Sequence, residues 1–347
     1  MVDGCTKPEA IAENFMHYFS KIYTPNSDSR AMSLYKEYML QRQNYFGFPL
    51  AAEDIIFDTE LVSKVIYDLK GGKAPDLAGL TAEHLQRAHP ILPVILSKFF
   101  QLIVMVRHVP VWFGHSYIVP LPKSKGYVSK PLSCEDFRGI AISPVISKIF
   151  EYCFLQKFGD YLCTDSKQFG FKKGMGCNHA INTVRCVIEQ LTKSGNTVNL
   201  CAIDLSKAFD KVNHHALLIK LMKRKLPVIL LELLENWLQN CFSCIKWTHV
   251  FSATFQIRFG VRQGSVLSPF LFAIYLDDIP VFRSLLPRSF VVLYADDILL
   301  IAPSVSELQE LFDACVIELS WLDMNINEKS IAMYPHWSTL GCEVQEH

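Results

Sequence analysis

The hydrophobic positions of the chain fall into long segments with helical spacing and short uninterrupted runs. The helical spacing predicts two helices within 1–50, separated by a polar break at 24–29, and two within 60–107, separated by a turn-forming cluster at 70–76. Further helices are predicted at about 143–163, 178–193, 213–225 and 268–278. Asn213 is a predicted N-cap, and Ser304 with Glu307 forms a capping box before a last helix.

Short apolar runs rich in branched residues predict the strands. They lie at 117–121, 198–204, within 245–260, and at 290–294 and 298–301. The last two runs are separated by three residues, 295–297, and therefore predict a hairpin.

Three carboxylates stand at the ends of these apolar strands. Asp204 ends the run at 198–204, and Asp296 and Asp297 form the tip of the predicted hairpin. Burying unpaired carboxylates costs several kcal/mol, so such groups are neutralised, paired or bound to metal. If the strands are neighbours, the three acids would meet and suit Mg²⁺, and two such ions about 4 Å apart support phosphoryl transfer. For an isolated Asp-Asp pair, a solvated turn is the alternative.

Composition and charge exclude only a few classes of protein. The 347 residues are 50% hydrophobic and 20% charged, which is typical of globular proteins and excludes wholesale disorder. Lys plus Arg and Asp plus Glu both number 34, but 101–225 holds 18 basic and 8 acidic residues between acidic flanks. A basic middle could bind a polyanion locally, and chance clustering of solvated side chains is the alternative.

The cysteines and the first residues suggest a compartment. Eleven cysteines are scattered without even pairing, and no apolar leader precedes them, which predicts a reducing intracellular setting, nucleus or cytoplasm, and no secretion. The pair Cys241 and Cys244 has no second pair at zinc-finger spacing. Because no uncharged apolar run reaches 18 residues, no membrane contact is expected.

Six motifs in a fixed order resemble those of reverse transcriptases. Tyr-Ala-Asp-Asp at 294–297 resembles the YxDD box, 202–210 resembles motif A, and 260–269 resembles motif B between them. Residues 137–140 and 168–174 resemble two motifs of the fingers, and 73–80 resembles the start of the domain in non-LTR (LINE-type) retrotransposon enzymes. The six motifs cover roughly 60–330, and their order makes the resemblance specific.

This resemblance implies an α+β fold, the palm and fingers of a right-hand polymerase, with a small antiparallel sheet backed by helices. It implies an N-terminal helical extension at 1–59 and a reverse transcriptase domain at 60–347. Within that domain the fingers would cover about 60–195 and the palm about 196–335. The thumb would be absent or vestigial, and an endonuclease domain is not expected within these 347 residues.

The resemblance also implies roles for the acids and their neighbours. Asp204 and Asp296 would be the main ligands of both metal ions, with Asp297 supporting and Leu205 offering a backbone carbonyl. Phe209 would stand beside the sugar of the incoming nucleotide and exclude a 2′-hydroxyl by steric clash. A plain core aromatic is the alternative for Phe209.

Further residues match the family's nucleotide pocket. Gln263 and Gly264 would line the site where the template base meets the nucleotide. Arg138 and Lys123 would hold the triphosphate, with ordinary solvated side chains as the alternative. Lys329 would lie near the leaving pyrophosphate as a general acid.

Lys172 and Lys173 would touch the template backbone or simply solvate the surface. The implied function is RNA-directed DNA polymerisation with two Mg²⁺ ions, for which Mn²⁺ could substitute. The partners would be an RNA template, a DNA primer and deoxynucleoside triphosphates. Two alternatives stay open: a catalytically inactive RNA-binding remnant of a retrotransposon, and an expressed product without a selected role.

Overall fold

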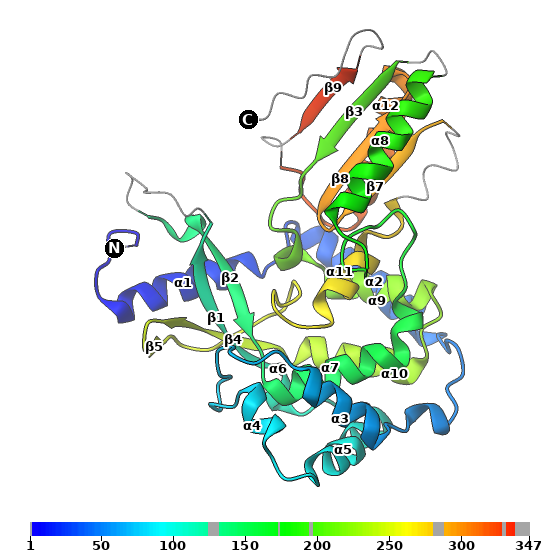
Figure 1. The fold of residues 1–347 in the computed structure, drawn as a ribbon. Helices are drawn as coiled ribbons and strands as arrows, with labels where there is room; N and C mark the ends of the chain where they lie inside the picture. The colour runs from blue at the N-terminus through cyan, green and yellow to red at the C-terminus, as the bar shows by residue number, and fades with distance from the viewer. Residues whose placement is uncertain are drawn as a thin grey trace. The chain divides into compact units, whose positions relative to one another are not determined.

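The computed structural model describes residues 2–123, 132–172, 174–193, 197–279, 288–327 and 331–336 (Figure 1). The chain divides into two compact units. The first contains Met1–Cys163 and Phe209–Leu271, and the second contains Thr164–Ala208 and Phe272–His347. The division cuts through helix α11 (Ser268–Leu276), so each unit is built from segments distant in sequence.

The second unit is built around a four-stranded antiparallel sheet (Figure 1). The strand order is β7 (Phe290–Tyr294), β8 (Asp297–Ala302), β3 (Val198–Ile203) and β9 (Ala332–His336). Branched and aromatic residues make up most of β7 and β8, which suits a sheet buried on both faces. The strands predicted at 198–204, 290–294 and 298–301 are confirmed, and β9 was not predicted.

One helix packs on each face of this sheet. Residues of α8 (Cys177–Lys193) form a buried cluster with Val198 of β3 and Ile301 of β8. Successive strand residues point to opposite faces, so Cys201 lies on the other face, where Cys315 of α12 (Val305–Trp321) is its neighbour. The Ser304 hydroxyl accepts a hydrogen bond from the Glu307 amide at 3.2 Å, which confirms the predicted cap of α12.

The first unit holds a five-stranded mixed sheet. Its order is β2 (Phe137–Ile142), β1 (His115–Pro122), β4 (Phe242–Trp247) and β5 (Val250–Phe251), and β6 (Phe255–Gln256) also pairs with β4. Strands β1 and β4 are parallel, whereas the other pairs are antiparallel.

Helices make up the rest of the first unit and enclose a core rich in aromatic rings. Phe150 contacts Phe57, Phe100 and Trp237 there, with ring centroids 5.1–6.0 Å apart. The helices are α1 (Pro8–Ile22), α2 (Asp28–Gln43), α3 (Thr59–Asp68), α4 (Ala82–Gln86), α5 (Leu92–Val106), α6 (Val111–Gly114), α7 (Val145–Phe158), α9 (His214–Lys223) and α10 (Val228–Gln239). Short 3-10 turns cover Glu53–Ile55, Cys134–Asp136, Gly159–Leu162 and Ala208–Lys211.

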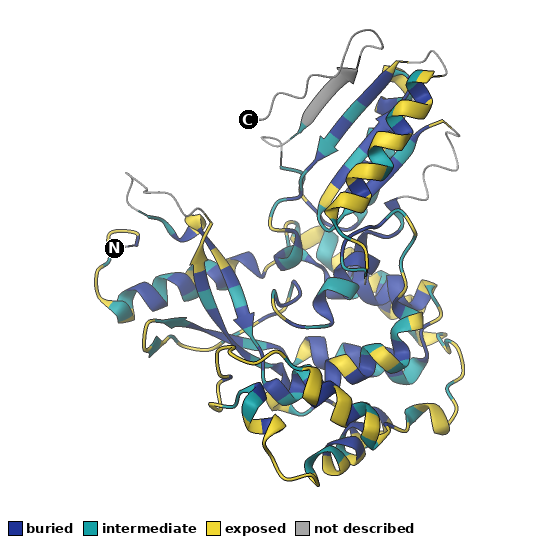
Figure 2. Cartoon of the chain, in the orientation of Figure 1, coloured by how far each residue is buried: buried dark blue, intermediate teal, exposed yellow. Residues whose placement is uncertain are grey.

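Burial follows the layers in each unit. The strands β7, β8 and β3 are mostly buried, and the outer face of α8 is exposed (Figure 2). Across the described ranges, no helix combines the length and the apolar character needed to cross a membrane.

The sequence patterns missed strand β2 and helices α6 and α10 of the first unit. Gly139 interrupts β2 and weakens its strand signal. The glycine is needed because a Cβ at this position would lie 2.7 Å from the Phe19 ring and 2.9 Å from Ile118. Close packing of α1 and β1 against β2 therefore explains why this strand contains a glycine, which made it hard to recognise from the sequence.

Candidate active site

Asp204 and Asp297 face each other at the end of the sheet in the second unit. The register of β3 and β8 pairs Ile203 with Ile298, so the next residues along each strand, Asp204 and Asp297, stand opposite one another. Burial raises the pKa of Asp297, and the negative charge of Asp204 raises it further. The two carboxylates predicted to meet are therefore close enough to repel each other.

Asp296 lies beside this pair, in the two-residue turn between β7 and β8. Tyr294 pairs with Asp297, which leaves Ala295 and Asp296 as the turn itself. Ala295 has a φ of 56°, in the left-handed region that non-glycine residues seldom adopt. Such a conformation persists only where surrounding contacts hold it.

A buried glutamine holds the turn in place. The Gln168 side chain is fully buried, and its Oε1 accepts hydrogen bonds from the amides of Gly170 (2.9 Å) and Ala295 (3.2 Å). Its Nε2 donates to the Ala295 carbonyl at 3.4 Å. Two backbone hydrogen bonds join Leu293 to the same segment, through the Phe169 amide and the Lys167 carbonyl.

Gly170 allows the loop to approach the turn this closely. A Cβ at Gly170 would lie 2.4 Å from the Ala295 nitrogen, so a larger residue would displace one of the two segments. Gln168 and Gly170 belong to the motif at 168–174, but the sequence patterns predicted no role for either residue. Nothing in the local sequence indicates that these two residues contact Ala295, which lies 125 or more residues further along the chain.

Asp204 is held by a segment near the end of the described chain. The Asn327 Nδ2 donates to the Asp204 carboxylate at 2.9 Å, and the Asn327 amide donates to the Asp204 carbonyl at 2.9 Å. The Ser206 amide donates to the Asn325 carbonyl at 3.0 Å. Leu205 lies between Asp204 and Ser206, and its own carbonyl takes part in neither of these two backbone hydrogen bonds. Asn327 is a further residue that the sequence analysis did not single out.

The donor chemistry at this end of the sheet fits a hard cation in part. Two facing carboxylates and a third in the adjoining turn are the oxygen ligands that Mg²⁺ prefers. In the described part of the chain, however, no group of three or more His, Cys, Asp or Glu side chains is arranged to hold a metal ion. Asp204 and Asp297 are thus brought together, whereas a complete three-acid group is not formed.

The predicted nucleotide-binding residues Phe209, Gln263 and Gly264 belong to the first unit. The Val261 amide donates to the Phe209 carbonyl at 2.8 Å, which places the motif B loop beside the residue proposed to face the sugar. The Phe209 side chain is half-buried. The Gln263 Nε2 donates to both carboxylate oxygens of Asp210, at 3.1 and 3.2 Å.

The loop around Gly264 is fastened to strand β2. Gly264 has a φ of 119°, and a Cβ there would lie 2.3 Å from the Ala141 carbonyl oxygen. The Ala141 amide donates to the Gln263 carbonyl at 2.7 Å. A backbone conformation open only to glycine and the lack of space explain why this position is glycine.

Glu151 of α7 anchors the other end of the same loop. Its buried carboxylate accepts hydrogen bonds from the amides of Val266 (2.6 Å) and Leu267 (2.8 Å) and from the hydroxyls of Ser265 and Ser147. The donors at 265–267 precede helix α11, whose N-terminus favours negative charge. Sequence patterns gave no indication of this role.

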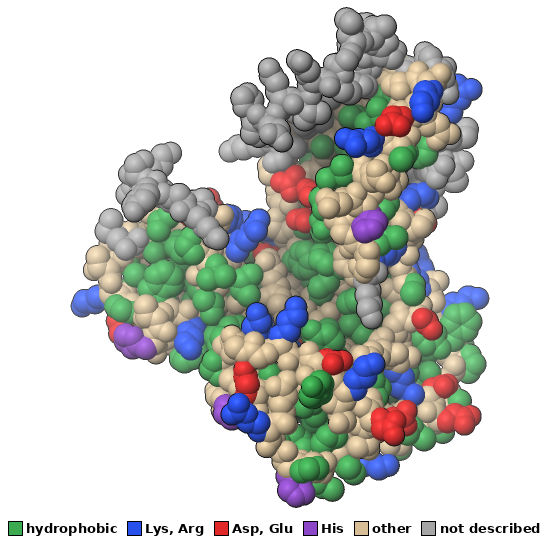
Figure 3. Space-filling model, in the orientation of Figure 1, with side chains coloured by type: hydrophobic (Ala, Val, Ile, Leu, Met, Phe, Trp, Pro, Cys, Tyr) green, Lys and Arg blue, Asp and Glu red, His purple; other side chains and the backbone are tan. Residues whose placement is uncertain are grey.

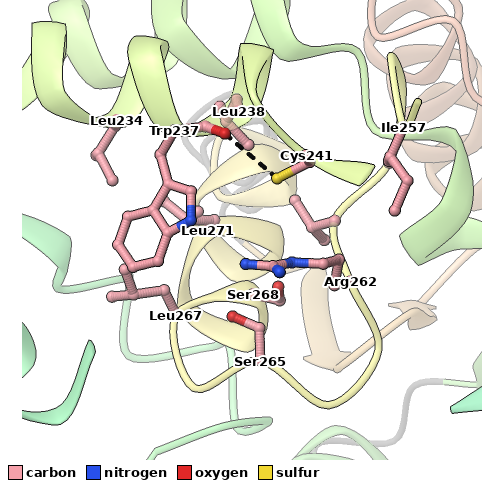
Figure 4. A pocket seen from close by; sticks show the side chains of 12 residues that line it. Leu234, Trp237, Leu238, Cys241, Ile257, Arg262, Ser265, Leu267, Ser268 and Leu271 are labelled. Atoms are coloured by element: carbon pink, nitrogen blue, oxygen red, sulfur yellow. Dashed lines mark hydrogen bonds between the residues drawn. The ribbon is translucent and has the colours of Figure 1, made fainter. Parts of the chain in front are cut away.

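Arg262 anchors the start of the loop. Its guanidinium is buried and donates to the carbonyls of Phe113 (3.1 Å) and Gly114 (3.2 Å). Figure 4 shows the guanidinium between Cys241 and Ser268, beside a cavity of about 30 Å³. The Cys241 thiol donates to the Trp237 carbonyl at 3.3 Å.

Arg138 and Lys123 lie at the same end of the β1–β2 hairpin, and both are exposed. Arg138 pairs with Leu121 of β1, and the Lys123 amide donates to the Asp136 carbonyl at 2.8 Å. Arg138 points to the same face of β2 as Ile140 and Ile142, because alternate residues share a face.

Ile140 and Ile142 line a cavity of about 580 Å³ that Gly264 also borders. Lys70, Lys73 and Lys148 bring positive charge to this cavity, and burial lowers the pKa of Lys148. Residues 73–80 were matched to a motif from the sequence, but the sequence did not indicate that this segment borders the same cavity as Gly264.

The predicted template lysines are only partly described. The Lys172 ammonium donates to the Thr164 carbonyl at 3.2 Å and to the Asp165 carbonyl, so its charge is engaged within its own loop. Lys173 and Lys329 lie outside the described residues. On the face shown in Figure 3, Lys and Arg side chains occur in small groups among hydrophobic and acidic ones.

Comparisons with known proteins agree with these motifs. The family described as "Reverse transcriptase (RNA-dependent DNA polymerase)" matches residues 121–344. A probable RNA-directed DNA polymerase from transposon X-element of Drosophila melanogaster is 29% identical over 68% of this chain and 26% of its own length. The RNA-directed DNA polymerase from mobile element jockey of the same species is 26% identical over 89% of this chain and 34% of its own length.

The chain therefore spans about a quarter to a third of the length of these two curated relatives. Among solved structures, an apo telomerase from Candida tropicalis is 15% identical, with a TM-score of 0.49, covering 65% of this chain and 51% of that one.

The family match confirms the predicted fold class, an α+β palm and fingers with a small antiparallel sheet backed by helices. It extends from β1 through motifs A and B and the hairpin that carries Asp296 and Asp297. The chain belongs to the reverse transcriptase family, and it is a domain of the type found in non-LTR retrotransposon polymerases.

Proposed function

We propose that this chain catalyses RNA-templated DNA synthesis by nucleotidyl transfer. The observation that carries the proposal is the pair Asp204 and Asp297, two carboxylates that face each other beside Asp296 at the end of a buried sheet. Holding two negative charges close together does not stabilise a fold, so the simplest explanation for the pair is that it binds a cation.

Asp204 and Asp296, with Asp297 and the Leu205 carbonyl, would hold two Mg²⁺ ions, with Mn²⁺ as a possible substitute. Bound there, the cations would favour ionisation of the primer 3′-hydroxyl and neutralise charge on the phosphates. Asn327 would orient the Asp204 carboxylate by its hydrogen bond, and Gln168 would hold the turn that carries Asp296.

In the reaction, the primer 3′-oxygen would attack the α-phosphorus of a deoxynucleoside triphosphate, and the bond to the pyrophosphate oxygen would break. Lys329 would give a proton to that leaving oxygen. Arg138 and Lys123, exposed on the β1–β2 hairpin, would hold the triphosphate while it is displaced.

The remaining residues would select substrates. Phe209 would exclude a ribose 2′-hydroxyl, and Gln263 with Gly264 would line the pocket for the new base pair. Lys172 and Lys173 would contact the template, whose recognition should depend on backbone charge rather than base sequence. In these terms we assign residues 60–195 to the fingers, 196–335 to the palm and 1–59 to a helical extension.

Extension of a DNA primer on an RNA template by the purified chain with Mg²⁺ and four deoxynucleoside triphosphates tests the proposal. We expect extended products that disappear with a chelator and are restored by Mg²⁺. RNA binding should be measured on the same preparation. Binding without extension would contradict the proposal and favour a non-catalytic RNA-binding protein, and the absence of both would reject each function.

A further inference from the structure

Asp210 is a buried carboxylate whose side chain has partners from two segments that are far apart in the sequence. It is 7% exposed, and it lies six residues after Asp204, where motif A ends. One partner is Gln263 of the motif B loop, and the other is Tyr23 at the end of α1. A buried carboxylate with satisfied partners marks a defined arrangement, because leaving it unpaired would cost several kcal/mol.

The contact with Gln263 fixes the direction of a carboxamide. The Gln263 Nε2 lies 3.1 and 3.2 Å from the two Asp210 oxygens, and an ionised carboxylate only accepts hydrogen bonds. The NH₂ group must therefore face Asp210, and the Oε1 atom must point away from it. Without a carboxylate at position 210, the Gln263 carboxamide could turn either its NH₂ group or its Oε1 atom towards that position.

Tyr23 supplies the second donor. The side chain is 3% exposed and forms a side-chain hydrogen bond with Asp210, which requires the phenol to donate its proton. Burial raises the pKa of Tyr23 well above its ordinary value, and the charge of Asp210 raises it further. The phenol therefore stays protonated as a permanent donor at any ordinary pH.

The backbone around Asp210 leaves little room for adjustment. A Cβ at Gly260 would lie 2.6 Å from the Asp210 carbonyl oxygen, and the Gly260 amide donates to the Val212 carbonyl at 2.7 Å. The His214 ring contacts the Gly260 carbonyl through Nε2 at 2.8 Å. The Asp210 backbone is thus closely packed against Gly260, and its side chain is bonded to Tyr23.

We infer that Tyr23 and Asp210 are positioning residues that orient the Gln263 carboxamide, so that its carbonyl oxygen is presented as a hydrogen-bond acceptor in the nucleotide pocket. The inference rests on the proposed function for the role of Gln263. It also gives the N-terminal segment a purpose, because helix α1 then contributes to nucleotide selection through Tyr23.

The first arm of the test measures coupling between Tyr23 and Gln263 without any enzymatic reaction. Urea unfolding is measured for Tyr23→Phe, Gln263→Leu and the double variant. We expect the effect of one substitution on the unfolding equilibrium constant to change by about threefold to tenfold when the other is present. Tyr45→Phe is the matched control, since it removes a hydroxyl bonded to the Leu226 carbonyl in the same unit.

The second arm measures nucleotide affinity with chemistry blocked. Equilibrium binding of the next deoxynucleoside triphosphate is followed on the full chain bound to a template and a dideoxy-terminated primer. We expect Tyr23→Phe to weaken binding about threefold to tenfold and Asp210→Asn by tenfold or more, because Asn can bond to Gln263 with either end of its amide. Tyr45→Phe should bind as the wild type does.

The two arms separate the possible failures. If Tyr23→Phe and Gln263→Leu affect unfolding independently, the contacts from Tyr23 through Asp210 to Gln263 do not couple these residues, and the inference is wrong. Coupling with unchanged nucleotide affinity would overturn the positioning role and leave a purely structural one. A wild-type complex that binds no nucleotide would reject the proposed function, and the positioning role with it, while the unfolding cycle would still decide whether the three residues act together.

Discussion

Asp297 lies opposite Asp204 where strands β8 and β3 end, and the charge of Asp204 raises the pKa of Asp297. Repulsion between the two carboxylates therefore works against the folded state of the metal-free protein. Catalytic groups commonly show such a conflict between function and stability.

Replacing Asp297 with Asn should stabilise the metal-free protein slightly. A carboxyl group whose pKa is higher in the folded state than in the unfolded state reduces stability above that pKa, and the neutral amide removes this effect. Because Asp297 is only partly buried and much of its surface remains open to solvent, the gain should be only a few tenths of a kcal/mol in roughly physiological salt. Urea unfolding at pH 7 with a chelator measures it, and a clear loss of stability would show that Asp297 is needed for folding.

Gly170→Ala should impair catalysis by displacing the turn that carries Asp296. The added Cβ would lie 2.4 Å from the Ala295 nitrogen, so the turn or the loop must move. A displacement of about 1 Å can cost a hundredfold in rate. Gly176→Ala is the matched control, because a Cβ there meets nothing within 4 Å. Equal incorporation rates for the two variants would mean that the Gly170 contact does not position the acids.

Phe209→Val should admit ribonucleotides. If the half-buried ring occupies the space of a 2′-hydroxyl, the smaller side chain should lower the preference for deoxynucleotides roughly tenfold to several hundredfold. The ratio of deoxy- to ribonucleotide incorporation measures this, alongside a melting curve. A loss of about 3 kcal/mol in stability with an unchanged ratio would instead assign Phe209 to the core.

Acid should destabilise the first unit through His214. Burial lowers the pKa of His214 to about 4, although its hydrogen bond to the Gly260 carbonyl opposes this shift. The unfolded state therefore binds more protons below pH 6.5, and stability is lost as the pH falls from there through 4. We expect a loss of about 2 kcal/mol between pH 7 and 5 from this residue.

The His214→Gln variant isolates this contribution, because the amide can still donate to the Gly260 carbonyl but does not titrate. The variant should lose less stability than the wild type between pH 7 and 5, whereas His249→Gln on the surface should behave as the wild type does. The same pH dependence in His214→Gln and wild type would show that His214 is not the source.

The sequence predicted the features that local physical chemistry determines. The buried strand before Asp204 and the hairpin at Asp296 were visible as apolar runs that end in acids, and Asn213 was recognised as a cap. The cap is confirmed, since the Asn213 Oδ1 accepts from the amides of His215 (2.9 Å) and Ala216 (3.1 Å).

The residues that hold the site in place were not predictable in the same way. Gln168, Asn327 and Glu151 each bond to a segment more than 100 residues away, and no spacing rule connects a polar residue to such a partner. Tertiary contact also overrides local signals, as in β2, where Gly139 is required by the Phe19 ring and yet disguises the strand.

Nucleotidyl transfer should depend on the acids at the end of the four-stranded sheet. The most direct measurement compares single-nucleotide incorporation on a DNA-primed RNA template by wild type, Asp296→Asn and Asp313→Asn, with folding and template binding checked for each. Asp313 is an exposed carboxylate on α12 of the same unit and controls for loss of charge. We expect Asp313→Asn to match the wild type and Asp296→Asn to lose activity by at least about a thousandfold. An undiminished rate in Asp296→Asn would show that these acids are not the catalytic groups.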